Sequence, residues 1–543
     1  MRKVKPRLQP EMMRLIAKRL EAKGYLGGKE VENISLRLHL PSSRVYGFAS
    51  QFEEFPLQPY RARLRVCTGP ACADAGAWAI LEDLEQKVPA DVLVTGEPGI
   101  LRWHRYPAVC VETPAKGAWL AEGLAPSDID ALVAAVEKDD FSSYKPMRDV
   151  LPSSPEAWSG NEPSPWSAAA GGALPETWGP DIVAWLSEHP DEAAKIMIES
   201  GAPGETWSRG GGSTAVLVCD TVGLEPENSV SFAASMLHPR AVVAGAAVAA
   251  AACGAKELVF YLPWNEGEAG GAFEAAAAEL LSGVGVRYSV FAGPVHVPCS
   301  LDIGKAAALR GMMLWSAASL YGWGGTLESE LPLAVLSAEL AWRLPWIKER
   351  EKGSRQGWAG SRLLCLNGLD GAPRLLEVTP GAKFAEVLAS LGVETGRGGF
   401  KAIYMAGFSA ADVVVPWDEA GAVESAGEAV MLDPLNCMPR WALYLAWHAE
   451  RGCCGGCAPG RTAPAAIARI IQAVLRGEAG EAELQRLGSL LETAGELALC
   501  PHLGEVLKPI FSCLEGFKDE FEAHAADGSC RAGSCAPAVE AAT

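Results

Sequence analysis

The chain has 543 residues, 49% of them hydrophobic, and a formal net charge of −19. This length and apolar content predict several domains with their own cores and exclude a largely disordered protein. The acidic balance argues against nucleic acid and anionic membranes as partners. We expect no signal peptide, and the longest low-polarity run, residues 241–255, is too short and too rich in Ala and Gly for membrane insertion. The sequence therefore predicts a cytoplasmic protein.

The first part of the chain, residues 1–150, predicts a small α/β domain preceded by helices. Apolar residues at helical spacing predict a helix over residues 12–20, which Gly24 ends. Residues 61–66 alternate polar and apolar side chains, which indicates a half-buried strand that leads into Cys67. The elements that follow are a helix, a strand and a helix, at 73–86, at 92–94 and from residue 127.

Residues 151–205 are rich in Pro, Ser, Gly and Trp and show little periodicity, so we predict a surface linker. Strand and helix patterns then alternate, at 215–219, 238–253, 257–262, 271–281 and 287–291. This alternation predicts a parallel sheet covered on both faces, in a domain over 206–348. Short strand patterns with one helix predict a small α+β unit over 349–430. A helical segment over 431–525 and a tail over 526–543 complete the chain.

Fifteen cysteines in a chain without an expected export signal indicate reduced thiols and metal sites rather than disulfides. The alternative is that most of them are small buried apolar residues. We expect this alternative for the cysteines in apolar or strand-like surroundings, which are Cys219, Cys253, Cys299, Cys365 and Cys437.

The first cysteine pattern is Cys67-x4-Cys72, where a predicted strand turns into a helix. A helix dipole stabilises thiolates at this position and suits iron–sulfur ligation. Cys110, at the end of another predicted strand, is a third candidate ligand, and Pro114 stands where a Cys-x3-Cys spacing would place a fourth. A dithiol enzyme that uses Cys67 and Cys72 is a weaker alternative, because its usual spacing is Cys-x2-Cys.

Two further patterns lie toward the C-terminus. The run Cys453-Cys454-Gly-Gly-Cys457 places three thiols within five residues, which favours a soft metal, and Cys500 follows a helical segment. The tail offers one imidazole and two thiolates, which match the tetrahedral preference of zinc. These tail residues are His524, Cys530 and Cys535, with Cys513 as a candidate fourth ligand. A frayed terminus with reducible thiols is the alternative for the tail.

Three stretches carry a resemblance to a known family: Gly-Tyr-Leu at 24–26, Ser-Arg-Val-Tyr-Gly at 43–47 and Val-Cys-Thr-Gly-Pro-Ala-Cys at 66–72. Through them residues 11–135 resemble the small thioredoxin-like [2Fe–2S] subunit of respiratory complex I and of NAD-reducing hydrogenases. Residues 206–525 resemble the flavoprotein subunit of the same complexes, which binds FMN, NADH and one [4Fe–4S] cluster. The resemblance implies a natural fusion of the two subunits, with other redox subunits as partners.

The resemblance also implies the fold class. We expect an α/β multidomain chain with a helical plus thioredoxin-like domain, an α/β flavoprotein-like domain, a small β-grasp-like α+β domain and a C-terminal helical bundle. By the same resemblance, a [2Fe–2S] site keeps three cysteines, Cys67, Cys72 and Cys110.

The cubane motif of the family reads Glu-Ser-Cys-Gly-x-Cys-x-Pro-Cys-Arg-x-Gly, with a fourth cysteine after two helices. Here Cys454, Cys457 and Cys500 fall on ligand positions of the [4Fe–4S] cluster. Gly460 replaces the remaining cysteine, and Cys453 is a possible substitute. A three-thiolate site, a site that uses Cys453 and the absence of a cluster all remain open.

The FMN and NADH site of the family has lost polar groups in this chain. The Gly-rich loop that cradles the FMN phosphate keeps only its start, and two acidic positions of the next motif are Val222 and Gly223. The remnants of the site are Arg209, Gly210, Gly211, Gly212, Glu225 and Glu339. Because each lost partner of a buried ligand costs about 1–3 kcal/mol, the sequence predicts that tight flavin binding is lost.

Two functions are therefore open. The first is a non-catalytic iron–sulfur subunit that relays electrons, or serves as a scaffold, in a larger redox complex. The second is an active subunit that oxidises NADH or reduces NAD through FMN. The replaced polar residues favour the first function.

Overall fold

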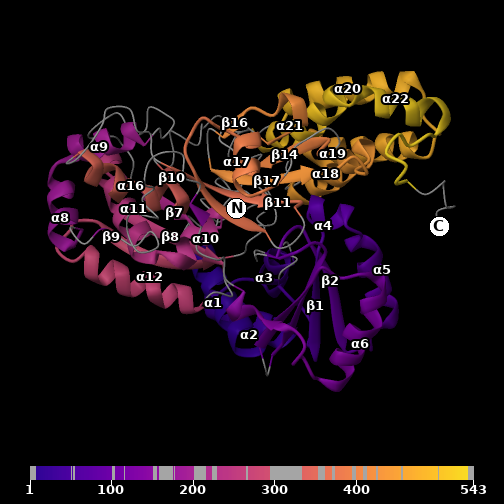
Figure 1. The fold of residues 1–543 in the computed structure, drawn as a ribbon. Helices are drawn as coiled ribbons and strands as arrows, with labels where there is room; N and C mark the ends of the chain where they lie inside the picture. Colours follow the sequence, from indigo (N-terminus) through magenta and orange to yellow (C-terminus); the bar gives the residue numbers. More distant parts are fainter. Residues whose placement is uncertain are drawn as a thin grey trace.

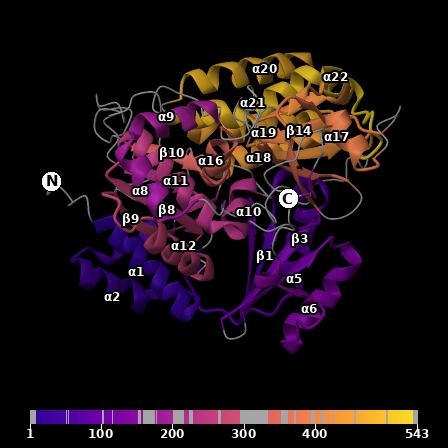
Figure 2. The same cartoon turned by 60° about the vertical axis from the view of Figure 1, so that its left-hand side comes forward.

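The computed structural model describes residues 8–50, 52, 55–100, 104–114, 117–150, 156–157, 175, 178–200, 216–222, 229–263, 267–293, 333–351, 361–369, 373–393, 399–407, 412–423, 426–453, 457–498 and 501–535. These residues form a five-stranded, a four-stranded and a six-stranded sheet, a two-stranded pair and a helical bundle (Figure 1). Residues 62–150, which hold the five-stranded sheet, lie below the bundle and beside the four-stranded sheet, as the turned view also shows (Figure 2).

The five-stranded sheet has the order β2-β1-β3-β4-β5 and defines what we call the first α/β domain. Its elements are β1 (Ala62–Cys67), α4 (Pro70–Asp74), α5 (Ala77–Lys87), β2 (Val92–Glu97), β3 (Ala108–Thr113), β4 (Gly117–Glu122), α6 (Ile129–Lys138) and β5 (Lys145–Pro146). The prediction that β1 is half-buried is wrong, because all six of its residues are buried. Arg63 and Arg65 tolerate burial because both pair with Glu97, at 2.7 and 2.6 Å.

The four-stranded sheet has the order β10-β7-β8-β9, and every pair of neighbours is parallel, as the alternating pattern predicted. Its elements are β7 (Val216–Asp220), α10 (Val230–Leu237), α11 (Pro239–Cys253), β8 (Glu257–Pro263), α12 (Gly267–Leu280), β9 (Arg287–Gly293), β10 (Leu333–Ser337) and α16 (Ala338–Glu351). Helices α11 and α16 cross closely at Gly245, where an added Cβ would lie 1.7 Å from the Ala341 carbonyl oxygen.

Helices from two other parts of the chain cover this parallel sheet. The N-terminal helices are α1 (Leu8–Lys23), α2 (Gly28–Leu38) and α3 (Ser42–Ala49). The sequence placed them with the first α/β domain, but Ile16 and Val45 share a core with Val218 and Tyr261 of the parallel sheet. The N-terminal helices therefore cover one face of that sheet, and α11 and α16 lie in the core on the other.

The expected linker contains two helices, α8 (Pro180–Glu188) and α9 (Pro190–Glu199). For these residues the linker prediction is wrong. Each proline stands in the first turn of its helix, where the missing N–H has no intrahelical partner to lose. Val183 and Met197 are buried in the core that contains α11, so these helices pack on α11 and form an outer layer on that side of the sheet.

The six-stranded sheet has the order β15-β14-β17-β11-β12-β6. Its strands are β6 (Glu156–Ala157), β11 (Arg362–Asn367), β12 (Arg374–Val378), β14 (Ala402–Ala406), β15 (Val413–Pro416) and β17 (Gly427–Leu432), and α17 (Phe384–Ser390) and the pair β13 (Ala382–Lys383) and β16 (Ala422–Val423) accompany it. The predicted strands of the α+β unit are present. The sequence analysis missed β17, which lies inside the sheet between β14 and β11.

The predicted helical segment forms a bundle. Its helices are α18 (Met438–Gly452), α19 (Ala458–Leu475), α20 (Glu481–Glu496), α21 (Pro501–Gly516) and α22 (Lys518–Asp527). Leu445, Ile467, Leu487 and Ile510, from four of these helices, are buried in one core. The bundle core also contains Ala71 of the first α/β domain, so the two parts dock directly.

No single helix among the described residues is long and apolar enough to cross a membrane. Helices α10 and α11 meet that test only as a pair, and they are bent by 111° relative to each other.

Candidate metal centres

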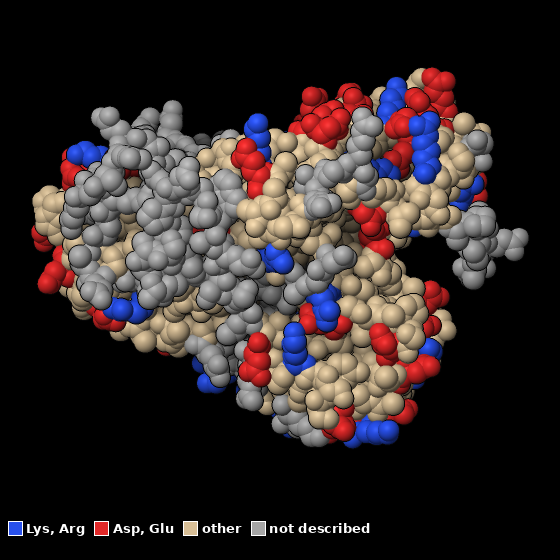
Figure 3. Space-filling view, in the orientation of Figure 1, with Lys and Arg blue, Asp and Glu red and all other residues tan. Residues whose placement is uncertain are grey.

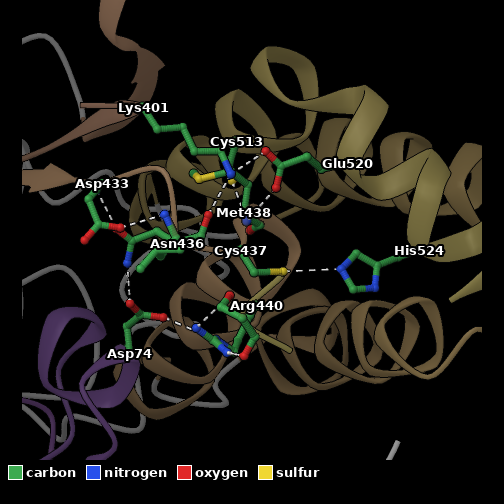
Figure 4. Close-up of polar contacts among 12 residues, drawn as sticks. Asp74, Lys401, Asp433, Asn436, Cys437, Met438, Arg440, Cys513, Glu520 and His524 are labelled. Atoms are coloured by element: carbon green, nitrogen blue, oxygen red, sulfur yellow. Dashed lines mark hydrogen bonds and ion pairs between the residues drawn. The ribbon is translucent and has the colours of Figure 1, made fainter. Parts of the chain in front are cut away.

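Four metal-ligating side chains converge where the chain's tail returns to the start of α18. Cys437 immediately precedes α18, His524 lies on α22, and Cys530 and Cys535 lie in the turn after α22. Their ligand atoms all lie within 4.8 Å of one another. Cys437 points toward His524, with its Sγ 3.4 Å from Nε2 (Figure 4). Three thiols and one imidazole fit tetrahedral zinc. We call these residues the tail group.

The local sequence explains how the tail reaches α18. Gly528, at φ 70°, ends α22 in the left-handed conformation, and Gly533, at φ 68°, turns the chain between the last two cysteines. Arg440 Nη1 then donates a hydrogen bond to the Ser534 carbonyl oxygen at 3.1 Å, which holds the turn against α18.

The thiols of the tail group differ in acidity. A hydrogen bond from Cys437, assisted by His524, outweighs burial and lowers the pKa of Cys535 to about 4. The same hydrogen bond, together with burial, raises the pKa of Cys437. The hydrogen bond to Cys535 also raises the pKa of His524. The group therefore holds a thiolate that favours a cation, and a bound metal would displace the remaining protons.

The structure brings together the three tail residues that the sequence predicted, His524, Cys530 and Cys535. Cys437 is buried, as expected for a small apolar residue, but the structure also places its sulfur with these three ligand atoms. Its position at the start of a helix, beside a proline in the first turn, was the available signal. Cys513 does not join the tail group; its thiol donates to the Met438 carbonyl oxygen at 3.4 Å, and burial raises its pKa.

A second group lies in the first α/β domain. Cys67 ends β1, Cys72 lies in α4, and His104 precedes β3; all three are buried. Their ligand atoms lie within 4.8 Å of one another, and Cys72 Sγ is 3.4 Å from His104 Nε2. Burial opposes ionisation of Cys67, but hydrogen bonds with Cys72 and His104 outweigh it and lower the pKa of Cys67 well below its usual value. We call these residues the first-domain group, and they fit a soft metal or an iron–sulfur centre.

His104 was not predicted from the sequence, and the fourth ligand position was wrongly placed at Pro114. Strand β3 runs antiparallel to β1, so that Val66 pairs with Val109. The Cys67 loop therefore lies near the start of β3, whereas Pro114 follows its far end, and the interpretation of Pro114 as a lost ligand is wrong. The structure leaves Cys110 outside the first-domain group, where its thiol donates to Glu112 Oε1 at 4.0 Å.

The predicted cubane site is described in part. Cys453 follows the last residue of α18, and Cys457 immediately precedes α19. Cys454 and Cys500 lie outside the described residues. The Gly460 amide donates to Cys457 Sγ at 3.3 Å, and an added Cβ at Gly460 would lie 3.2 Å from the same sulfur. A side chain at position 460 would therefore point at the sulfur of Cys457.

Most of the predicted flavin remnants lie outside the described residues, namely Arg209, Gly210, Gly211, Gly212 and Glu225. Cys299 lies outside them as well, whereas Cys219, Cys253 and Cys365 are buried as expected. Glu339 is described. It is 3% exposed, pairs with Arg343 at 2.9 Å and accepts a hydrogen bond from the Leu363 amide at 3.4 Å. Its carboxylate is therefore engaged inside the protein.

Helix α18 connects all three sites. The tail group lies at its start and the Cys453–Cys457 loop at its end. Between them, Arg440 pairs with Asp74 of α4 at 3.3 Å (Figure 4). Near the end of α18, Arg451 Nη1 donates to Thr68 Oγ1 at 2.7 Å.

Aromatic rings pack around this last contact. The rings of Trp78 and Trp447 are 5.2 Å apart, and the Arg451 guanidinium lies 4.9 Å from the centre of the Trp78 ring. The cysteine loop of the first α/β domain therefore docks on the end of α18 that leads to Cys453.

Comparisons with known proteins identify the two regions that meet there. Residues 1–118 match the family model for the thioredoxin-like [2Fe–2S] ferredoxin. Residues 440–524 match the family model for the iron–sulfur binding region of NADH–ubiquinone oxidoreductase F. The chain therefore combines a [2Fe–2S] region and a [4Fe–4S] region of these two kinds in one polypeptide, as the sequence predicted.

Among individual proteins, the NADP-reducing hydrogenase subunit HndC of Solidesulfovibrio fructosivorans is 30% identical over 188 residues. The aligned stretch covers 32% of this chain and 38% of that relative. Crystal structures of an NAD⁺-reducing [NiFe]-hydrogenase in the H₂-reduced and air-oxidised states each match with a TM-score of 0.73. They are 19% and 18% identical and cover 94% and 95% of this chain, and 92% and 94% of their own. This likeness confirms the multidomain fold.

Proposed function

We propose that this chain is an iron–sulfur subunit that passes electrons between two metal centres of a larger cytoplasmic redox complex and binds no flavin of its own. The contact between Arg451 and Thr68 is the observation that carries the proposal. Thr68 directly follows Cys67, and Arg451 lies two residues before Cys453, so a hydrogen bond of 2.7 Å joins the first cysteine loop to the end of α18. When bound, iron–sulfur centres supply one-electron redox chemistry.

Close packing between the first α/β domain and the end of α18 supports electron transfer. Tunnelling weakens less steeply through packed atoms than across a solvent gap, and the Trp78–Trp447 pair fills this region. The Arg451 cation contacts the residue after Cys67 and lies two residues before Cys453, and both regions gain negative charge when they bind thiolate-ligated iron. It therefore stabilises the reduced state of both centres, because an opposite charge nearby favours added negative charge.

Two observations support the absence of flavin. The polar groups that hold FMN and NADH in the resembled family are replaced by Val222 and Gly223 in this chain. Glu339, a described remnant, is committed to Arg343 and the Leu363 amide. The second candidate function, NADH oxidation through FMN, depends on the Gly-rich segment at 209–212.

One relative is named as a hydrogenase subunit, so we propose that this chain works with further redox subunits. The outer face of the bundle suits a basic neighbour, because acidic side chains gather there over α20 and α21 (Figure 3). On α20 the exposed acidic residues are Glu481, Glu483, Glu492 and Glu496. Binding between such surfaces would weaken as salt is added.

For the tail group we propose a structural zinc ion. A metal held by Cys437 and His524 would tie the start of α18 to α22 and so brace the bundle that carries the Cys453–Cys457 loop. All four positions are filled by protein ligands, which is typical of structural rather than catalytic zinc.

Electron paramagnetic resonance (EPR) of the anaerobic full-length protein tests the relay. We expect dithionite to reduce two centres whose signals broaden each other, because the loops are adjacent. Arg451→Met should slow electron exchange between the centres and shift both potentials downward, whereas Arg451→Lys should retain most of the charge effect. Two magnetically independent centres, with potentials that are unchanged in Arg451→Met, would contradict the proposal.

A further inference from the structure

We propose that His104 is a ligand of the iron–sulfur centre in the first α/β domain, which makes that centre a mixed cysteine and histidine site. The inference rests on the proposed function only in so far as an iron–sulfur centre occupies this domain. Cys72 Sγ and His104 Nε2 are 3.4 Å apart. Two ligands of one tetrahedral metal, with bonds of about 2.0–2.3 Å, are separated by roughly that distance.

Contacts of the two residues after His104 fix its position in the domain. The neighbouring Arg105 amide donates to Glu122 Oε2 at 3.1 Å, and the Arg105 carbonyl accepts from the Gly123 amide at 3.1 Å. The Tyr106 ring packs edge-on to the imidazole, with centroids 5.7 Å apart, and its hydroxyl donates to Glu428 at 3.1 Å. The imidazole is fully buried beside the two thiols. These contacts hold Nε2 toward Cys72.

The sequence around His104 offers no thiol that would take its place. Between residues 98 and 107, His104 is the only Cys, His, Asp or Glu. A Cys-x3-Cys spacing that ended at His104 would begin at Ile100, whose side chain is 3% exposed in the apolar core of the domain. Among the described residues, the group that can hold a metal here consists of Cys67, Cys72 and His104.

Replacement of a thiolate by an imidazole changes the centre in a measurable way. A neutral imidazole donates less negative charge to iron than a thiolate does. The same replacement raises the reduction potential of two-iron centres that have histidine ligands. We therefore expect this centre to have a higher potential than a variant with a cysteine at position 104.

The test uses the full chain, purified anaerobically with natural-abundance or ¹⁵N-labelled histidine. Pulsed EPR of the reduced two-iron centre should show a strongly coupled nitrogen that changes with the label. His104→Cys should retain iron, lose this coupling and shift the potential downward, and His104→Ala should lose the two-iron signal. His189→Gln, at an exposed histidine, is the matched control and should behave as wild type. Circular dichroism of every variant checks the fold.

Two outcomes would overturn the inference. The first is a two-iron centre without histidine nitrogen, or one with the same spectrum and potential in His104→Cys; this result leaves the relay intact. The second is zinc, or no metal, in the first α/β domain of wild-type protein while the other centre holds iron. An absence of iron from the whole chain would contradict both the inference and the proposed function.

Discussion

At the scale of single residues, the metal-ligating side chains lie at the ends of regular elements. Cys67 ends β1, Cys437 and Cys457 precede helices, and Cys453 follows one. A sulfur at the start of a helix lies near backbone N–H groups that have no partner within the helix. For example, the Gly460 amide in the first turn of α19 donates to Cys457 Sγ. The ends of rigid elements therefore fix the positions of these sulfurs.

Gly460→Cys should complete the cubane ligand set. An added Cβ at this position would lie 3.2 Å from Cys457 Sγ, so the new thiol would start beside the existing one. We expect more iron and acid-labile sulfide per chain and a stronger four-iron EPR signal. Gly488→Cys is the control, because an added side chain there meets open space. Equal iron content in both variants and wild type would count against a cluster at this loop.

The sequence predicted which closely spaced thiols belong to a group better than it predicted which distant residues join them. The spacing of Cys67 and Cys72, and of Cys530 and Cys535, is visible along the chain because each pair is local. Cys437 and His524 are 87 positions apart, and only the packing of α22 on the bundle brings them together. Cys72 and His104 are similarly joined by the antiparallel β1–β3 register. Ligands that depend on tertiary contacts have no pattern within a short window of sequence.

At the scale of elements, α18 joins the candidate metal centres. The tail group lies at its start, Cys453 lies at its end, and the first α/β domain packs against its side. Loss of the tail metal should therefore loosen the bundle. In Cys437→Ser we expect loss of bound zinc and a fall in the free energy of unfolding on the order of 3 kcal/mol. Zinc analysis and urea unfolding followed by circular dichroism measure both.

Cys513→Ala is the matched control for that variant. Its thiol is buried in the same bundle core but lies outside the tail group. We expect retained zinc and a loss of only about 1–2 kcal/mol, from packing and one weak hydrogen bond. Loss of zinc in both variants, or in neither, would refute the assignment of the tail group.

His238 lies at the bend between α10 and α11 and should make the free energy of unfolding depend on pH. Burial lowers the pKa of His238 to about 4, whereas the unfolded value is about 6.5. Between about pH 4 and 6.5 the unfolded chain therefore binds more protons at His238 than the folded chain does. The contribution of His238 to the free energy of unfolding is complete above about pH 6.5 and is lost as the pH falls toward about 4. The loss should be about 1–2 kcal/mol, since part of the ring meets solvent.

Urea unfolding of wild type and His238→Gln at pH 7 and pH 5 measures this contribution. The wild type should lose more stability between the two pH values than His238→Gln does. His189→Gln, at an exposed histidine, should retain the wild-type difference. Identical pH dependence in wild type and His238→Gln would remove His238 as the cause.

At the scale of the whole molecule, the sequence pattern correctly predicted the parallel sheet, from alternating strands and helices, and the helical segment over 431–525. It failed where position in the chain and position in space differ. The α1–α3 helices adjoin the first α/β domain in sequence, yet Val45 packs with Val218. Pro180 and Pro190 appeared to interrupt structure, although each begins a helix. Composition alone cannot separate a proline that breaks a helix from one that starts it.

The proposed function requires iron–sulfur centres in this chain and excludes a bound flavin. The full-length protein is purified anaerobically, assayed for iron, acid-labile sulfide and extractable flavin, and titrated first with NADH and then with dithionite while absorption is recorded. We expect iron and sulfide without flavin, no bleaching by NADH alone, and bleaching of the broad iron–sulfur absorption by dithionite. A stoichiometric flavin band that NADH bleaches would contradict it.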